Sequence, residues 1–400
     1  MIGGVFGEST GFLEVTDTTV PTGAKYVRFG ANTANQALKS YGRIKRQFTE
    51  LLTATEEKPD KLPFTFPLIN KSISVIGDSI SQGEKATSRI NDGYAGILRQ
   101  FFSLEFGKKL NFGFAPFTSR ATNATEMVSL NSWSGWTLAT NNGNVIGGSS
   151  YTTSSTGSTL DFTINHAFQK VKIAILKGSG FGSISLKQGS TIFGTVNTSA
   201  SSDGVAVSNA IDISSADFSQ SFQIVADSAP CTVSGLVLID DEDWWTFNNY
   251  GRSGAPASTF TGANFDYMSN SDIVFYALGV NGNRQGLAES LALIKDRFSA
   301  SRARKYVLDF CFYSPQLNSL SKKGVIRKFA AECGAEYIDI WSAAQKDSTG
   351  TYLADGFLNA DGIHPADSGH RFIAEYIAKR IGLSVNSKGL AQEVFGTRYE

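Results

Sequence analysis

An apolar segment that runs directly into Gly-Asp-Ser constrains this chain more than any other feature of its sequence. The residues Ser74-Val75-Ile76 have the composition of a buried strand and continue into Gly77-Asp78-Ser79. A parallel strand that ends in such a turn presents its serine hydroxyl at the carboxyl edge of the sheet, where open α/β sheets place reactive groups. The tripeptide alone also fits a plain tight turn, so a second observation is needed.

That second observation is the loop Asp361-Gly362-Ile363-His364-Pro365, far along the chain. A serine hydroxyl is a weak nucleophile at neutral pH, so it needs an imidazole to take its proton and a carboxylate to fix the tautomer of that imidazole. Asp361 and His364 can supply both groups from one short loop. We therefore predict that Ser79, Asp361 and His364 form a catalytic triad.

These two segments and two others resemble the four catalytic blocks of the SGNH (GDSL-type) hydrolase family. Gly77-Asp78-Ser79 resembles the nucleophile block, and Asp361 with His364 fills the last block. Asn249-Tyr250-Gly251-Arg252-Ser253-Gly254 resembles the second, and Gly279-Val280-Asn281 the third. The resemblance implies an oxyanion hole formed by the N–H groups of Ser79 and Gly254 and the side-chain amide of Asn281.

The chemistry of acyl transfer explains why such hydrogen-bond donors would be needed. Negative charge develops on the carbonyl oxygen, so donors aimed at that charge stabilise the transition state more than the substrate. The sequence departs from the family at one point, because Gly282 and Asn283 follow Asn281 where the third block usually continues Asn-Asp. Without the other blocks, Asn281 also fits an Asn tolerated in a turn beside glycines.

Charge and cysteine content exclude several classes of function. The 36 basic and 36 acidic residues give a formal net charge of zero, which argues against a nucleic-acid partner or an anionic membrane. Cys231, Cys311 and Cys333 are scattered and odd in number, so they indicate neither a disulfide framework nor a metal site, and one pair stays open. No cluster of His, Cys or carboxylates has ligand spacing, so we expect no catalytic metal and no cofactor.

The fold class follows from strands that alternate with helices. We expect a doubly wound, flavodoxin-like parallel sheet, built from residues 66–110 and 246–385 as a discontinuous hydrolase domain. The pattern stops between these pieces, where residues 111–245 are rich in Ser, Thr, Gly and Asn. Residues 131–210 contain only six charged side chains, against about fourteen expected from the chain average. Short alternating runs in this segment predict an inserted all-β sandwich.

The two ends are less informative. Residues 1–65 predict a β piece plus a helix, and residues 386–400 a C-terminal tail. The phrase Val20-Pro21-Thr22-Gly23-Ala24-Lys25-Tyr26-Val27 is similar to strands of small β-domains in phage tail proteins, and a plain edge strand fits it equally. The chain has no apolar stretch long enough to span a membrane and no secretory signal at its start.

The insert bears on the choice of substrate. The four blocks are shared by lipases, thioesterases and carbohydrate O-acetyl esterases, and an inserted polar β-domain resembles the carbohydrate-binding module of polysaccharide O-acetyl esterases. Aromatic residues near the junction could stack on sugars or fill an interdomain core: Trp133, Trp136, Trp244, Trp245 and Tyr250. For substrate binding we single out Trp244, Trp245 and Tyr250.

Three functions remain open at this point. The preferred one is a serine esterase that removes O-acetyl groups from a bacterial surface or cell-wall polysaccharide, with an acyl-enzyme on Ser79. It would act outside the cytoplasm, either secreted, at the cell envelope, or in a phage tail spike as part of a larger chain or oligomeric tail assembly. The alternatives are a lipase or thioesterase acting on short acyl esters, and a non-catalytic polysaccharide-binding tail module.

Overall fold

The structure is a computed structural model that describes residues 70–117, 127–310, 319–344 and 356–383. The chain divides into two compact units, Met1–Thr65 and Phe66–Glu400, and all described residues belong to the second. The predicted β piece plus helix at 1–65 and the tail at 386–400 therefore lie outside the described residues. No helix of the described part is both long and apolar enough to cross a membrane.

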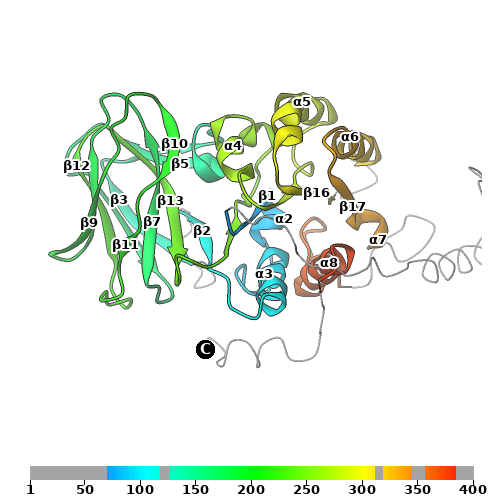
Figure 1. The fold of residues 1–400 in the computed structure, drawn as a ribbon, viewed down its shortest axis with the longest axis horizontal. Coiled ribbons are helices and arrows are strands. Elements are labelled where there is room, and N and C mark those ends of the chain that lie inside the picture. Colours follow the sequence, from blue (N-terminus) through cyan, green and yellow to red (C-terminus); the bar gives the residue numbers. More distant parts are fainter. Residues whose placement is uncertain (1–69, 118–126, 311–318, 345–355, 384–400) are drawn as a thin grey trace, which may run out of the picture. The chain divides into compact units, whose positions relative to one another are not determined.

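A five-stranded parallel sheet forms the centre of the hydrolase part (Figure 1). Its strands, in chain order, are β1 (Ser72–Gly77), β14 (Thr246–Asn249), β15 (Ile273–Ala277), β16 (Arg304–Asp309) and β17 (Glu336–Asp339). They lie in the order β14-β1-β15-β16-β17, and every neighbouring pair is parallel. In chain order this is 2-1-3-4-5, the flavodoxin-like arrangement. The predicted doubly wound sheet is confirmed.

Helices cover both faces of this sheet. They are α2 (Ser79–Gln82), α3 (Tyr94–Glu105), α4 (Ala263–Ser269), α5 (Arg284–Ala300), α6 (Ser319–Glu332), α7 (Ile340–Ala343) and α8 (Asp367–Arg380), with a 3-10 turn η2 (Ala257–Phe260). Figure 1 shows α3 and α8 together on one side of the sheet and α4, α5 and α6 on the other. Because both faces are covered, every residue of β15 is buried.

The segment between α3 and β14 forms two antiparallel sheets. Its elements are β2 (Gly113–Pro116), β3 (Val128–Ser134), β4 (Thr137–Thr140), η1 (Ile146–Gly148), β5 (Ser149–Thr153), β6 (Thr159–Ile164), β7 (Lys170–Lys177), β8 (Ser183–Gln188), β9 (Thr191–Asn197), β10 (Gly204–Val207), β11 (Ile211–Asp212), β12 (Phe222–Ser228) and β13 (Cys231–Ile239). One sheet has the order β10-β7-β13-β5-β4, with β2 on β13 and β11 on β7, and the other β3-β6-β12-β8-β9. We call this all-β segment the insert.

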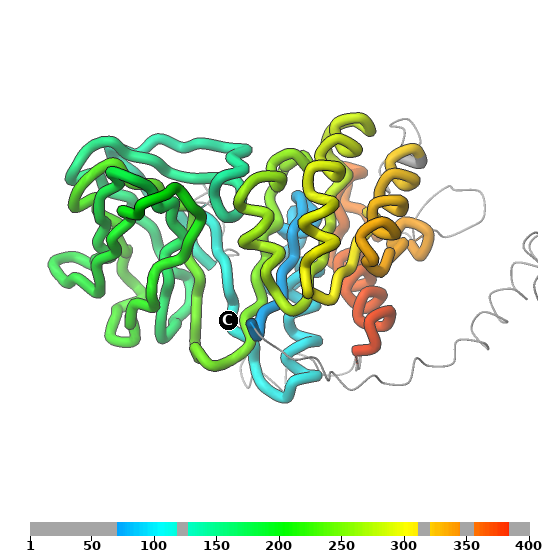
Figure 2. The backbone as a smooth tube through the Cα atoms, turned by 45° about the horizontal axis from the view of Figure 1, so that its top comes forward, coloured from blue at the N-terminus to red at the C-terminus, as the bar shows by residue number. Residues whose placement is uncertain are grey.

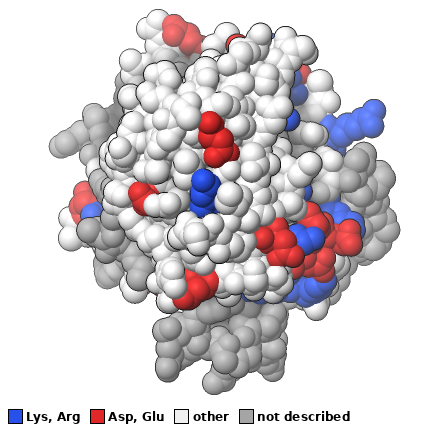
Figure 3. Space-filling model, turned by 90° about the vertical axis from the view of Figure 1, so that its left-hand side faces the viewer, with Lys and Arg blue, Asp and Glu red and all other residues white. Residues whose placement is uncertain are grey.

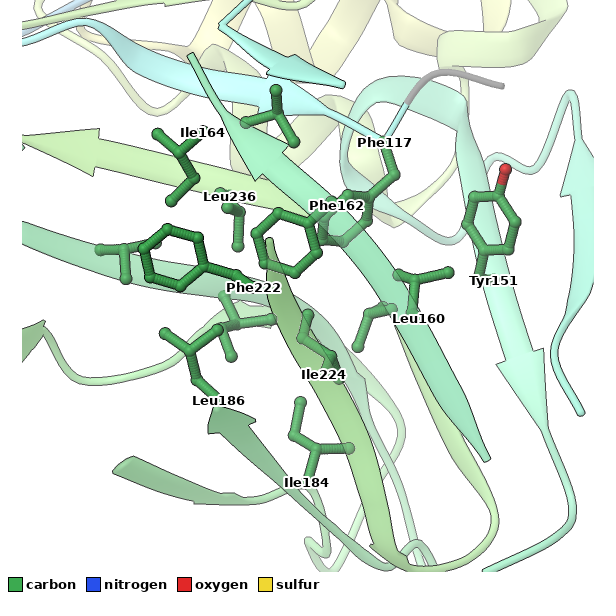
Figure 4. Close-up of a cluster of buried hydrophobic side chains, with 14 of the residues drawn as sticks. Phe117, Tyr151, Leu160, Phe162, Ile164, Ile184, Leu186, Phe222, Ile224 and Leu236 are labelled. Carbon is green, nitrogen blue, oxygen red and sulfur yellow. The ribbon is translucent and has the colours of Figure 1, made fainter. Parts of the chain in front are cut away.

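Alternating side chains from the two sheets fill the core of the insert. Burial alternates strictly along β6, as expected for a strand with one face inward. Phe162 and Phe222 are direct cross-strand partners, and their rings stack with centroids 5.9 Å apart. Figure 4 shows them at the centre of an apolar cluster, with Leu160, Ile224 and Leu186 around them. The expected sandwich is therefore a packed unit with its own core.

The insert also shares a core with the parallel sheet. Its residues Phe114, Ile146 and Ala174 belong to the same buried cluster as Tyr250 and Val274 of the hydrolase part. The rings of Phe114 and Tyr250 lie 5.2 Å apart. Figure 2 shows the two backbone passages between the parts, after α3 and before β14. The insert is therefore packed against the hydrolase part over a continuous apolar interface.

This shared core yields a stability prediction. Phe114 is only 2% exposed, so Phe114→Ala should lower the free energy of unfolding by about 3–5 kcal/mol, the usual cost of a buried Phe truncation. The loss should appear in one cooperative urea transition that removes both parts together. Leu293→Ala on α5, where the side chain is 66% exposed, is the matched control and should change stability by less than about 0.5 kcal/mol. Two separate transitions in Phe114→Ala would contradict a shared core.

Candidate active site

The local sequence explains how Ser79 is presented. Strand β1 ends at Gly77, and Asp78 caps α2, since its Oδ1 accepts a hydrogen bond from the Ile80 N–H at 3.1 Å. Ser79 is the first residue of that helix. A Cβ on Gly77 would lie 1.9 Å from Ser81 Oγ, so only glycine permits this tight strand-to-helix turn. The turn places the Ser79 hydroxyl at the carboxyl edge of the parallel sheet.

The structure brings the three predicted triad residues together. His364 Nε2 lies 2.9 Å from Ser79 Oγ, and His364 Nδ1 lies 2.9 Å from Asp361 Oδ2. Both distances are those of hydrogen bonds. With Nδ1–H donating to the carboxylate, Nε2 is left as the acceptor that faces the serine hydroxyl. The arrangement can remove a proton from Ser79 during attack on a carbonyl carbon.

Asp361 is kept ionised by its own loop. Its Oδ1 accepts hydrogen bonds from the backbone N–H groups of Ile363 at 2.9 Å and His364 at 3.0 Å. Partial burial opposes ionisation, but the backbone and side-chain hydrogen bonds from His364 and the bond from Ile363 outweigh it and lower the pKa of Asp361 to about 2. The carboxylate is therefore ionised at neutral pH and can orient the imidazole.

The loop that carries His364 is tied to the segment after the nucleophile. Asp367, in the first turn of α8, accepts hydrogen bonds from Thr87 N–H at 2.8 Å and Thr87 Oγ1 at 2.6 Å. Fully buried His370 accepts a hydrogen bond from the Tyr94 N–H through Nδ1 and contacts the Glu84 carbonyl oxygen through Nε2, each at 3.3 Å. These contacts fix the imidazole of His364 relative to the end of β1.

Three donors lie on the loops that follow neighbouring strands of the sheet. The Ser79 N–H opens α2 and has no intrahelical acceptor. Gly254 has φ +73°, and no described residue accepts a hydrogen bond from its N–H. Asn281 Nδ2 donates to the carbonyl of Ala255 at 3.2 Å, which ties the third-block side chain to the residue after Gly254. The second hydrogen of that amide remains available for a ligand.

The loop before Gly254 is held rigidly against the nucleophile turn. Asn249 donates through Nδ2 to the Ser81 carbonyl at 2.7 Å and accepts from the Gly251 N–H at 2.9 Å. Gln82 Oε1 accepts from the Ser253 N–H at 2.7 Å. Arg252 NH1 donates to the Gly148 carbonyl of the insert. The Gly254 loop is therefore fixed from one side by α2 and from the other by the insert.

The aspartate beside the nucleophile is only partly ionised at neutral pH. Asp78 is fully buried, and burial raises its pKa to about 7, against hydrogen bonds from backbone N–H groups and the positive charge of Lys322. A carboxyl group that is partly protonated at neutral pH opposes the negative charge that would develop next to Ser79 less strongly than a fully ionised one. Its capping role toward Ile80 needs only an acceptor oxygen, which either form provides.

A cleft of about 230 Å³ opens beside this centre, between the hydrolase part and the insert. Gln82, Arg252 and Ser253 line it from the hydrolase part, and Leu138 and Thr140 from the insert. Its floor contains an ion pair between Arg89 and Glu84, whose side chains are each 11% exposed and 2.7 Å apart. The lining is mixed, with hydroxyl, amide and guanidinium groups among apolar side chains.

The sequence reasoning did not identify several residues of the cleft. Gln82 could have been found, because it lies three residues after Ser79 and therefore on the same turn of helix. Arg252 lies within the second block itself. The insert residues Leu138 and Thr140 carry no sequence signal, since only the packing of the two parts places them at the cleft. The sequence therefore predicts which loops form the site, but it does not predict which side chains of the insert line the cleft.

The aromatic residues singled out for substrate binding need a correction. Trp245 is 5% exposed and packs on Phe106 with ring centroids 4.8 Å apart, while Tyr250 is 3% exposed and packs on Phe114. Neither can offer a ring face to a sugar, because both are buried, and Tyr250 lies in the core where the insert meets the parallel sheet. Trp244 is partly buried beneath the Lys108 ammonium group. Trp133, by contrast, is 44% exposed.

The described residues hold no group of three or more His, Cys, Asp or Glu side chains that could bind a metal ion. Cys231 and Cys333 are buried free thiols, and Cys311 lies outside the described residues. The chemistry that the site can perform with its own groups is nucleophilic attack by Ser79, with His364 as base and backbone and amide donors nearby.

Comparison with known proteins supports the fold. No protein-family model and no curated protein matches the chain. A solved structure of a peptidoglycan O-acetylesterase is similar at a TM-score of 0.55 and 17% identity, covering 78% of this chain and 90% of the other. Two further similar structures have lower TM-scores. An acetylxylan esterase from Geobacillus stearothermophilus has 0.31 at 16% identity, covering 36% and 76% of the two chains. A GDSL-like lipase from Bacteroides thetaiotaomicron has 0.28 at 15%, covering 34% and 75%.

The first of these likenesses spans most of both chains, so it includes the insert as well as the parallel sheet. At 17% identity it establishes the fold. The chain therefore has the SGNH hydrolase fold with an inserted β-domain, as the four blocks and the low-charge segment predicted.

The buried histidine yields a prediction on stability and pH. Burial lowers the pKa of His370 to about 4, below the value of about 6.5 for an exposed imidazole. Between these values the unfolded chain binds the extra proton, so the contribution of His370 to the free energy of unfolding should fall as the pH drops from about 6.5 to 4, by up to about 1.4 kcal/mol per pH unit. The raised pKa of Asp78 changes stability in the opposite sense over this range, so urea unfolding should be compared between the wild type and a variant that lacks His370.

His370→Gln provides the control for that prediction. The variant cannot take up this proton, so the difference in stability between wild type and variant should be largest near pH 7.5 and should shrink toward pH 4. A difference that stays constant with pH would show that His370 does not titrate in this way.

Proposed function

We propose that this protein is a serine esterase that removes O-acetyl groups from a polysaccharide through an acyl-enzyme on Ser79. The observation that carries the proposal is the unbroken chain of hydrogen bonds from Ser79 Oγ through His364 to Asp361, at the end of β1. The SGNH fold around it supports the same assignment. The chemistry and the geometry of Ser79, His364 and Asp361 together support the catalytic roles that we assign to them.

In the first half of the reaction, Ser79 Oγ bonds to the acetyl carbonyl carbon while its proton passes to His364 Nε2. The carbonyl oxygen becomes negatively charged in the tetrahedral intermediate. Ser79 N–H, Gly254 N–H and Asn281 Nδ2 are the donors that we assign to this oxygen. When the intermediate collapses, the bond to the sugar oxygen breaks, and His364 returns the proton to that oxygen. The products are a free sugar hydroxyl and acetyl-Ser79.

The second half repeats these roles with water as the nucleophile. His364 takes a proton from the water while the water oxygen bonds to the acyl carbon, and the same donors face the second oxyanion. Collapse of this intermediate breaks the bond to Ser79 Oγ, which recovers its proton from His364. Acetate leaves and the enzyme is restored. Asp361 stays ionised throughout and stabilises the imidazolium that forms in each half.

The cleft favours a small acyl group on a polar carrier. Polar groups line much of it, including Gln82, Arg252 and Ser253, and a buried ion pair forms part of its floor. A long acyl chain would require a continuous apolar channel, because burying apolar surface provides its binding energy. The polysaccharide that we propose belongs to a bacterial surface or cell wall, so the protein would act outside the cytoplasm, secreted, at the envelope, or in a virion tail.

The first test is Ser79→Ala. Hydrolysis of a small aryl acetate should fall by about 10⁴-fold or more, because no other group near His364 can form the acyl-enzyme. Ser81→Ala is the matched control on the same turn, since Ser81 Oγ hydrogen-bonds Tyr94 Oη rather than His364, and it should keep most of the activity. Near wild-type turnover in folded Ser79→Ala would rule out the mechanism.

The same assay separates the esterase from the lipase or thioesterase alternative. Wild-type enzyme should release acetate from O-acetylated xylan or O-acetylated peptidoglycan, and its activity on aryl esters should decline as the acyl chain lengthens. A preference for longer acyl chains, with no acetate released from either polymer, would favour the lipase. Absence of all ester hydrolysis would favour the non-catalytic binding module.

The second prediction concerns the oxyanion donor from the third block. Asn281→Ala should lower kcat by about 10²- to 10³-fold and leave KM nearly unchanged, since the amide acts mainly in the transition state. Steady-state kinetics on an aryl acetate would measure both constants. Because Asn281 also holds the Ala255 carbonyl, thermal stability should be recorded in parallel. An unchanged kcat in a folded variant would remove Asn281 from the oxyanion hole.

A further inference from the structure

We propose that Trp133 forms a sugar-stacking subsite on the insert, reached from Ser79 along the cleft. The inference rests on the proposed function and deepens it, because it assigns a binding position for the polysaccharide chain away from the acetyl group that reacts. The ligand class is a pyranose unit of the acetylated polysaccharide.

The exposure of Trp133 sets it apart from the other tryptophans. Trp133 is 44% exposed, whereas Trp136, Trp245 and Trp341 are 4%, 5% and 8% exposed. A single exposed aromatic ring is common on protein surfaces and carries no argument by itself. The case for a sugar-binding role comes from where the Trp133 ring lies and from the residue on which it packs.

Trp133 lies at the open edge of the insert, where both sheets end. Strand β3 is the edge of one sheet and β4 the edge of the other. Trp133 pairs with buried Leu160, and Leu138 pairs with Tyr151, so both exposed side chains point toward the interior side of their sheets. The sandwich is thus left uncovered along this edge.

The Trp133 ring is held in a fixed orientation. It packs edge-on against Tyr151, with centroids 5.5 Å apart and an angle of 61°. Tyr151 is only 1% exposed and lies at the margin of the sandwich core on β5 (Figure 4). A ring that is supported from behind by a buried tyrosine loses little conformational freedom when a ligand binds. Its free area can then serve as a flat platform.

The cleft reaches β4, the strand that pairs with β5 and its residue Tyr151, on which the Trp133 ring packs. Leu138 is 37% exposed and also lines the cleft, together with Gln82 and Ser253. Gln82 belongs to the same short helix as Ser79, and Ser253 immediately precedes Gly254. Leu138 therefore lies between the cleft and the Trp133 ring, because it pairs across strands with Tyr151, on which that ring packs. A chain of sugars that places one acetyl group at Ser79 would extend over Leu138 toward Trp133.

The surrounding surface fits a pyranose better than an acidic or basic ligand. A pyranose has apolar C–H faces and a rim of hydroxyl groups, so it matches an aromatic face bordered by uncharged polar groups. Ser132 and Ser134, the chain neighbours of Trp133, point to the other face of β3, so the nearby side chains on the interior side are Leu138 and, two residues further along β4, Thr140, which both line the cleft. Figure 3 shows charged side chains scattered over one face of the molecule, with a cluster of both signs on one side and uncharged surface over most of the rest. A second copy of this chain or a partner peptide would be the competing occupants.

The test compares Trp133→Ala with Ile192→Ala. Ile192 is an exposed apolar residue of the same insert, at 57%, and lies on β9 at the opposite edge of the sheet that contains β3. Trp133→Ala should raise KM about five- to tenfold for acetate release from O-acetylated xylan or O-acetylated peptidoglycan, and leave the kinetics on a small aryl acetate unchanged. Ile192→Ala should change neither. Trp133→Tyr should restore most of the loss, because it keeps a ring.

A binding measurement separates this inference from the proposed function. In a Ser79→Ala background the polymer cannot be turned over, and adding either acetylated polymer should protect Trp133 fluorescence from acrylamide quenching. If aryl acetate hydrolysis is absent in wild type, the proposed function fails.

If hydrolysis is present but Trp133→Ala equals Ile192→Ala on both polymers, or neither polymer alters the fluorescence, the subsite is rejected. Dimerisation that Trp133→Ala abolishes, measured by light scattering, would assign the platform to a second copy instead.

Discussion

The position of β1 between β14 and β15 is the constraint on which the site depends. Parallel pairing on both sides ends all three strands at the same edge of the sheet. The residue after β1 leads to Ser79, the loop after β14 carries Gly254, and the loop after β15 carries Asn281. The pairing of these three strands is therefore enough to bring Ser79, Gly254 and Asn281 to one edge of the sheet. Only His364 arrives from elsewhere, and Asp367 and His370 anchor its helix to the segment that follows Ser79.

The insert joins the parallel sheet next to the loop that carries Gly254. It enters between the first and second strands of the parallel sheet, and its Gly148 carbonyl accepts the hydrogen bond of Arg252, two residues before Gly254. The buried contact between Phe114 and Tyr250 lies under the same loop. Each part thus contributes one wall of the cleft. The geometry of the Gly254 loop depends on how the insert packs against it. This coupling explains how a β-domain can be inserted here without leaving the Gly254 loop unsupported.

The sequence predicted the parallel sheet and the triad because both depend on local rules. Buried strands that end at Gly77 and near Asn281 are apolar runs, and a Ser, His and Asp set has few other chemical uses. The low charge and the alternation of polar and apolar residues predicted that the insert is a sandwich. They did not predict the order of its strands. Strands β3 and β4 are adjacent in the chain yet join different sheets, a choice that depends on long-range pairing. The exposure of aromatic residues depends on the same pairing, which is why Trp245 and Tyr250 were misjudged.

The contrast between Trp133 and Trp136 shows where sequence reasoning stops. The two residues flank one turn, yet one is 44% exposed and the other 4%. Gly135, between them, has φ +74°, and a Cβ there would lie 2.2 Å from Ser158 Oγ. The turn is therefore shaped by contact with a distant loop, and that contact decides which indole faces solvent. A catalytic serine can be recognised from its neighbours in sequence because its chemistry needs particular partners. A sugar platform needs only an exposed ring in the right place, and that place is set by the tertiary fold.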